Sequence, residues 1–141
     1  LEPDLAATRR MHVDYMPVLF PGYSFANTNR ALGQPATPSN QIPRDCGRFY
    51  WRQVYNALGA GATMLYGAMF DEVNEGTAMF KMLSDAAGVP VTGIPAGYSF
   101  VTLDADGCAL PSDWYLSLAG AATAAVHSGT PPSPNLPLPI P

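Results

Sequence analysis

The sequence predicts an α/β fold: a partial (β/α) TIM-barrel-type domain that contains about the last three βα units of a parallel barrel. Three observations carry this prediction. Apolar runs alternate with segments of helical periodicity, a long polar loop follows the first run, and a cluster of carboxylates follows the second. Alternating strands and helices form parallel sheets through right-handed crossovers. Because a whole barrel takes roughly 250 residues, the chain is either part of a barrel or a small sheet closed by a partner.

The first half of the chain is expected to contain one strand, one loop and one helix. The apolar run over residues 11–20 is stopped by a Pro-Gly pair and predicts a strand buried on both faces. Residues 23–44 lack periodicity and predict a long surface loop, a common place for function. Beyond Asp45, a candidate N-cap, apolar residues recur with helical spacing up to a Gly-Ala-Gly stop, which predicts a helix over 45–59.

The second half repeats the alternation. Residues 62–70 predict a second buried strand, 77–87 a short helix, 98–103 a third strand and 104–107 a turn. A last helix is expected over 112–126, with Ser112 as its cap and Gly129 as its stop. We assign residues 1–129 to the barrel-like domain and residues 130–141, which are rich in proline, to an extended, unpacked tail.

Composition restricts the class of protein. With 141 residues, 48% hydrophobic and 13% charged, the chain can bury one core. The net charge is −4 and no basic stripe is present, which disfavours nucleic-acid binding. The longest apolar stretch falls short of the roughly 20 residues of a membrane span. The chain starts at Leu1 without a signal-like segment, so we expect a processed or excised piece.

The two cysteines leave the redox state open. Cys46 and Cys108 permit one disulfide, but Cys46 falls on the apolar side of the expected helix, which favours a buried free thiol. The compartment therefore stays undetermined, with secretion as one possibility.

The strongest chemical signal is the carboxylate segment Asp71, Glu72 and Glu75. These acids follow a strand, where barrel enzymes carry their catalytic residues. Crowded carboxylates repel one another's ionised forms, so one stays protonated while another is ionised, as glycoside cleavage requires. The alternative interpretation is that the acids only favour the N-terminus of the helix expected from Thr77.

The segment from Phe70 to Thr77 also resembles the strand-end motif Phe-Asn-Glu-Trp-His-Glu-Gly-Thr of glycoside hydrolase family 99, the endo-α-mannosidase and endo-α-mannanase family. Five of the eight positions agree, and Asp71, Val73 and Asn74 differ. Residues 18–24, 42–53 and 110–115 look like bacterial and fungal members grouped with families 71 and 99. The resemblance covers residues from about 11 to 126.

The resemblance implies a role for each glutamate. Glu72 would act as a base on the sugar 2-hydroxyl, which attacks the anomeric carbon, and Glu75 would act as general acid and then as base. Stereochemistry would be retained. For substrate binding we select Asp71, Tyr23, Phe25, Arg44, Phe70 and Asn74, although aromatic side chains beside apolar strands are more often part of a core.

No metal or cofactor is expected. His12 and His127 have no second ligand at zinc spacing, and the calcium-like turn at 104–107 has Tyr115 where the loop needs Glu.

Three functions remain open from the sequence. The leading one is a retaining glycoside hydrolase that acts on an oligosaccharide or polysaccharide. The second is a non-catalytic, lectin-like carbohydrate-binding protein, and the third a structural or defensive protein. Because unpaired sheet edges associate, we also expect a homo-oligomer or a partner that supplies the missing part of the barrel.

Overall fold

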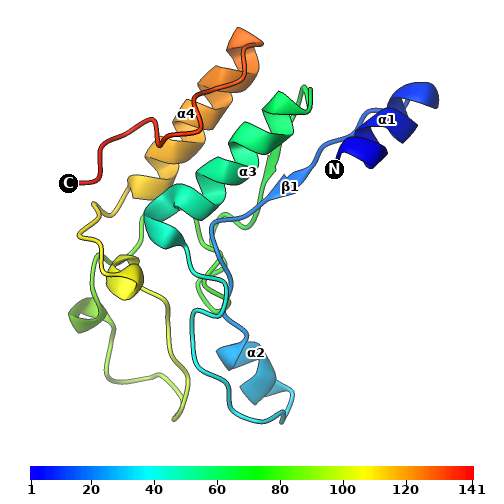
Figure 1. The fold of residues 1–141 in the computed structure, drawn as a ribbon. Coiled ribbons are helices and arrows are strands. Elements are labelled where there is room, and N and C mark those ends of the chain that lie inside the picture. The colour runs from blue at the N-terminus through cyan, green and yellow to red at the C-terminus, as the bar shows by residue number, and fades with distance from the viewer.

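The computed structural model describes all 141 residues of the chain. It is a mixed α/β structure with one small parallel sheet (Figure 1). The helices and strands, with three short 3₁₀ turns, follow the order α1 Glu2–Arg10, β1 Val18–Leu19, α2 Ala26–Ala31, η1 Asp45–Gly47, α3 Arg48–Gly59, β2 Tyr66–Gly67, η2 Ala86–Gly88, η3 Leu103–Asp106 and α4 Trp114–Ser128. No helix has the length and apolar character to cross a membrane.

Helices α3 and α4 lie side by side and form the centre of the core (Figure 1). Each has an apolar face with helical spacing. The buried residues are Tyr50, Trp51, Val54, Ala57 and Leu58 on α3 and Trp114, Tyr115, Leu118 and Ala122 on α4. The helices predicted over 45–59 and 112–126 are therefore confirmed, and α4 ends at left-handed Gly129 as expected. The N-cap residue of α4 is Asp113, so the prediction of Ser112 as its cap is wrong.

Helix α3 begins later than the expected Asp45 cap, and the reason is its contact with α4. Gly47 is the N-cap residue of α3 and has φ +94°, a conformation that favours glycine. A Cβ at Gly47 would lie 2.7 Å from both Trp114 Nε1 and Leu118 Cδ1. Asp45 instead pairs with the exposed Arg48 and Arg52 on the surface. The close approach of two helices thus determines where α3 starts.

The sheet is much smaller than the sequence predicts. Of the strands expected over 11–20 and 62–70, only two residues each form a strand. The two strands pair in parallel, with Val18 opposite Tyr66 and Leu19 opposite Gly67. Leu19 is buried, but Val18 and Tyr66 are 58% and 50% exposed. The prediction of strands buried on both faces is therefore wrong. The strand expected over 98–103 and the helix expected over 77–87 do not form. The alternation of strand and helix is therefore present in one unit, β1–α3–β2, and three barrel units are not observed.

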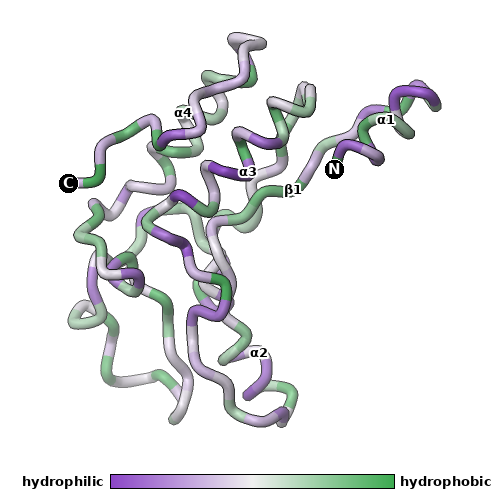
Figure 2. Tube along the Cα trace, viewed as in Figure 1, coloured by the Kyte–Doolittle hydropathy of each residue, from purple (hydrophilic) through white to green (hydrophobic).

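Helix α1 was not expected, although its sequence has the usual signals. Proline lies in its first turn, acids lie near its start and arginines near its end. Most of the helix is hydrophilic (Figure 2), and only Leu5 is buried. Arg9 joins it to the rest of the molecule by donating to the Gly61 carbonyl at 2.7 Å.

The C-terminal tail has no helix or strand, yet it packs against the core. It turns back after α4 (Figure 1), and Leu136, Leu138 and Ile140 contact the buried cluster. Trp51 Nε1 also donates a hydrogen bond to the Ser133 carbonyl at 3.0 Å. The expectation of an unpacked tail is wrong because three apolar side chains, which alternate with proline, pack against the hydrophobic core.

Cys46 and Cys108 form a disulfide across 62 positions, so the favoured free thiol is wrong. The bond ties the start of α3 to the segment that precedes α4. In the entropy model, closing a loop of this length stabilises the fold by about 4 kcal/mol.

Candidate functional site

The carboxylate turn, residues 71–76, follows β2 and is held by its own backbone. The amide of Gly76 donates to the Val73 carbonyl at 3.3 Å, and the amide of Thr77 donates to the Glu72 carbonyl at 3.1 Å. Gly76 has φ +66°, which a side chain would strain. No helix follows the turn, so the interpretation that its acids only favour a helix N-terminus is wrong.

Residues of the loop after β1 fix this turn from outside. The Ser24 amide donates to the Glu75 carbonyl at 2.7 Å. Asn27, which is buried, donates through Nδ2 to the carbonyls of Asn74 at 2.9 Å and Ser99 at 2.7 Å. A single amide side chain therefore joins the carboxylate turn to the segment near Ser99. The sequence showed this loop only as polar and long, and it did not identify Ser24 or Asn27.

Arg44 is a structural residue in this fold. It is 2% exposed, and its guanidinium donates to the carbonyls of Gly76 at 2.7 Å and Ala78 at 3.1 Å. The guanidinium also lies over the ring of Tyr115, 4.8 Å from its centroid. Burial lowers the pKa of Arg44 below its usual value. We predicted Arg44 as a substrate ligand, but the structure places it behind the carboxylate turn, where it supports the backbone.

Glu75 is the centre of a small polar cluster. The Thr28 hydroxyl, on α2, donates to Glu75 Oε1 at 2.9 Å. Burial raises the pKa of the Tyr23 phenol above its usual value, and the hydrogen-bonding interaction with Glu75 adds a smaller rise. The charge of Glu72 contributes to the same rise. Tyr23 is therefore close enough to both glutamates to experience their charges. Thr28 was missed because nothing local to its position distinguishes it from other loop hydroxyls.

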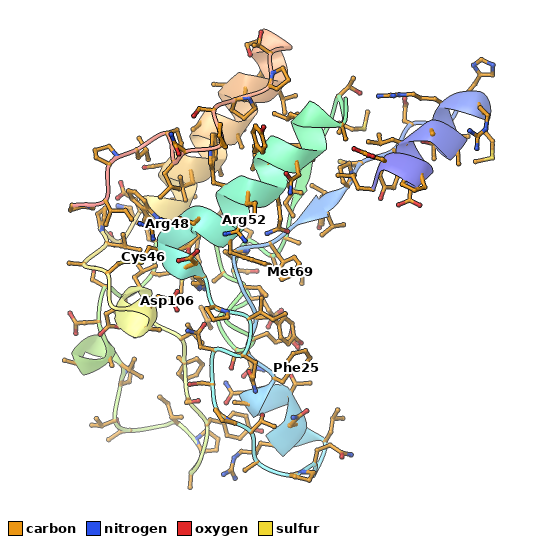
Figure 3. The ribbon with its side chains drawn as sticks, viewed as in Figure 1. Phe25, Cys46, Arg48, Arg52, Met69 and Asp106 are labelled. Carbon is orange, nitrogen blue, oxygen red and sulfur yellow. A yellow bond between two sulfur atoms is a disulfide. The ribbon has the colours of Figure 1, made fainter.

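Aromatic rings flank this cluster. The rings of Tyr23 and Phe25 are 4.5 Å apart at their centroids and tilted by 52°. Phe25 lies where the chain enters α2 (Figure 3) and is 43% exposed. Phe70 is 63% exposed beside Phe80, Asp71 is exposed, and Asn74 is half-buried. The loop after β1 and the turn after β2 thus bring Tyr23, Phe25, Glu72 and Glu75 to one region.

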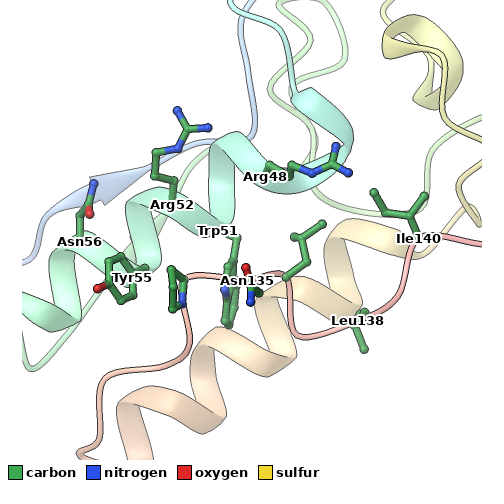
Figure 4. Close-up of a pocket in the computed structure, with 10 residues that line it drawn as sticks. Arg48, Trp51, Arg52, Tyr55, Asn56, Asn135, Leu138 and Ile140 are labelled. Atoms are coloured by element: carbon green, nitrogen blue, oxygen red, sulfur yellow. The ribbon is translucent and has the colours of Figure 1, made fainter.

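Two of the surface pockets lie outside this cluster. One, of about 590 Å³, is open to solvent and lies between α3 and the C-terminal tail (Figure 4). The other, of about 330 Å³, is apolar and includes Val73 of the carboxylate turn in its wall. Neither Glu72 nor Glu75 lines either cavity. No group of three or more His, Cys, Asp or Glu side chains is arranged to hold a metal ion.

Comparison with known proteins gives a match in structure and none in sequence. No family model and no curated protein matches the chain significantly. Among solved structures, the chain is similar to the GH99 endo-α-mannosidase from Bacteroides thetaiotaomicron in complex with bis-tris propane, with a TM-score of 0.66 and 16% sequence identity. The similarity covers 91% of this chain and 35% of that enzyme. The chain therefore has the fold of a part of that glycoside hydrolase and spans about a third of its length.

Proposed function

We propose that this chain is the active-site segment of a retaining glycoside hydrolase of the endo-α-mannosidase type, with Glu72 and Glu75 as its catalytic pair. The observation that carries the proposal is geometric: both glutamates belong to one hydrogen-bonded turn after β2, and Glu75 Oε1 accepts from the Thr28 hydroxyl at 2.9 Å. The similarity in fold to part of an endo-α-mannosidase supports the same assignment.

In the proposed first step, Glu72 accepts the proton of the sugar 2-hydroxyl. The oxygen of that hydroxyl attacks the anomeric carbon, the glycosidic bond breaks, and Glu75 gives its proton to the leaving oxygen. In the second step, Glu75 accepts a proton from water, and the water oxygen opens the anhydro ring at the anomeric carbon. Glu72 returns its proton to the 2-oxygen. The two displacements restore the original stereochemistry.

The surroundings of Glu75 hold its carboxyl group in one position. The Thr28 hydroxyl occupies Oε1 and fixes the orientation of the carboxyl group. Burial and the nearby glutamates favour the neutral form of Tyr23, so its phenol keeps a proton with which to donate a hydrogen bond. Phe25 and Phe70, both exposed, are suited to stack on sugar rings. Asp71 and Asn74 supply polar groups beside them.

The experiment compares Glu72→Gln and Glu75→Gln with Glu2→Gln in the natural full-length protein. Glu2 is exposed on α1, far along the chain from the turn, and provides the same chemical change as a control. We expect each of the first two variants to lose at least about 100-fold in hydrolysis of α-mannose oligosaccharides. Binding measured by calorimetry should persist. Unchanged turnover in either variant would refute the catalytic assignment.

A lectin-like function is the second candidate. It is favoured by the exposed rings of Phe25 and Phe70, which are suited to stack on sugar rings whether or not cleavage follows. Binding of oligosaccharides without turnover in the full-length protein would support it, and absence of binding would exclude both candidates.

A further inference from the structure

The side chain of Asn27 is buried and makes three hydrogen bonds to backbone groups far along the chain. Asn27 lies on α2 and is 1% exposed. Its Nδ2 donates to the Asn74 carbonyl at 2.9 Å and to the Ser99 carbonyl at 2.7 Å, and its Oδ1 accepts from the Ser99 amide at 3.0 Å. Both donors of the side-chain amide are therefore in use. A flipped amide would turn its oxygen towards two carbonyls, so these partners fix its orientation.

Three residues of the loop after β1 hold the chain at Glu75. The Ser24 amide donates to the Glu75 carbonyl at 2.7 Å, and the Thr28 hydroxyl donates to Glu75 Oε1 at 2.9 Å. Asn27 holds the carbonyl of Asn74, the residue immediately before Glu75. The backbone and the carboxyl group of Glu75 are thus fixed from one short stretch of chain.

Asn27 also sets the position of the carboxylate turn against the segment 99–101. No other protein group bonds to the Asn74 carbonyl or to the backbone amide and carbonyl of Ser99. The segment packs on the turn, since a Cβ at Gly76 would lie 2.9 Å from Val101 Cγ2. Loss of the Asn27 amide therefore removes the hydrogen bonds that join three parts of the chain.

Glu72 is held in a different way. Its carbonyl accepts from the Thr77 amide at 3.1 Å and from the Thr77 hydroxyl at 3.3 Å, both within the same stretch of chain. No hydrogen bond joins Glu72 to the loop after β1. A change at Asn27 should therefore displace Glu75 more than Glu72.

We propose that Asn27 is a positioning residue for the acid step, an inference that rests on the proposed function. Asn27 is buried and acts through Glu75, because its hydrogen bonds keep the Glu75 carboxyl group where its proton reaches the leaving oxygen. Proton donation matters most when the leaving group is poor, as a sugar hydroxyl is. Fluoride departs as a stable anion and needs little of this help. Asn27 therefore matters for cleavage of an oligosaccharide and much less for cleavage of a glycosyl fluoride.

The first test compares Asn27→Ala with Asn29→Ala in the natural full-length protein. Asn29 is the matched control, since it also lies on α2 but donates to the Thr37 hydroxyl at 3.3 Å, away from the turn. The measured quantity is kcat/KM for an α-mannose oligosaccharide and for the corresponding oligosaccharyl fluoride. We expect Asn27→Ala to lower it roughly 10- to 100-fold for the oligosaccharide and by less than about threefold for the fluoride. Asn29→Ala should leave both values unchanged.

The two substrates separate this inference from the proposed function. If the wild type cleaves both substrates and Asn27→Ala loses equally on both, or on neither, the positioning role is wrong and the proposed function stands. If the wild type cleaves neither, the proposed function is wrong, and the acid step in which Asn27 is placed is lost with it.

Hydrogen exchange tests the position of the turn without any substrate. We expect the amides of residues 71–77 to exchange about fivefold faster in Asn27→Ala than in the wild type, and at the wild-type rate in Asn29→Ala. Unchanged exchange in Asn27→Ala would overturn the inference whatever the kinetics show. Circular dichroism establishes that the variants fold. If Asn27→Ala does not fold, Asn27→Asp replaces it in both tests, because it keeps the size of the side chain and an acceptor for the Ser99 amide.

Discussion

The Thr28 hydroxyl donates a hydrogen bond of 2.9 Å to Glu75 Oε1, although 47 positions separate the two residues in the chain. Thr28 lies on α2, in the loop after β1, and Glu75 lies in the turn after β2. Since β1 and β2 are parallel neighbours, the segments that follow them meet at the same edge of the sheet. The bond therefore forms because the two strands are parallel neighbours, and it fixes the position of the Glu75 carboxylate.

Removing this hydroxyl should reduce activity without unfolding the protein. In the natural full-length protein, we expect Thr28→Val to lower kcat/KM for α-mannose oligosaccharides by roughly fivefold, because a hydrogen bond that orients a side chain contributes about 1 kcal/mol. Thr28→Ser keeps the hydroxyl and should restore most of the activity. Steady-state kinetics on both variants checks this, and an equal loss in both would mean that shape, rather than the hydroxyl, matters at this position.

Arg44 should be a major determinant of stability. Arg44→Met leaves the buried carbonyls of Gly76 and Ala78 without their donor, so we expect a loss of about 2–4 kcal/mol in the free energy of unfolding. Arg52→Met is the matched control, since Arg52 is 66% exposed and only pairs with Asp45 at 3.7 Å. It should change stability by less than about 1 kcal/mol. Urea denaturation of the two variants distinguishes these values, and equal midpoints would contradict the role of Arg44.

Stability should fall in alkaline solution as buried tyrosines ionise. Burial raises the pKa of Tyr115 to about 12, an effect that Arg44 partly offsets. A raised pKa means that the unfolded chain loses its proton first, so the stabilising contribution is complete below about pH 10 and is lost as pH rises towards 12. The Tyr115 hydroxyl has no hydrogen-bond partner, so Tyr115→Phe should leave stability at pH 7 nearly unchanged. Thermal unfolding of the wild type and variant between pH 8 and about pH 12 should show a smaller alkaline loss in the variant, and parallel profiles would refute this.

The open face of the sheet should make the chain associate. Val18 and Tyr66 are register partners, and both are exposed together with the nearby Met16 and Met69. Exposed apolar patches and unpaired sheet edges both favour assembly. We expect concentration-dependent association in sedimentation velocity that Val18→Lys reduces. Val91→Lys, which changes an exposed valine on a loop, should have no effect, and a monomer at all concentrations would contradict the prediction.

The sequence by itself determined the two central helices and the position of the carboxylate turn. Helix α3 and helix α4 were predictable because a helix satisfies its backbone hydrogen bonds within one segment. Their apolar faces and the stop at Gly129 are therefore local signals. The acids at 71–75 follow β2 as expected, since a glycine-rich apolar run and the polar segment after it are likewise read locally.

Tertiary structure alone decided the lengths of the strands, the formation of the Cys46–Cys108 disulfide and the burial of Arg44. A strand exists only as far as a neighbour pairs with it, and β1 and β2 have one partner each for two residues. Arg44 is buried because the carbonyls of Gly76 and Ala78, more than 30 positions away, face its guanidinium. Contacts between distant segments carry no periodicity in the sequence, so the surroundings of Glu75 became visible only when the chain was folded.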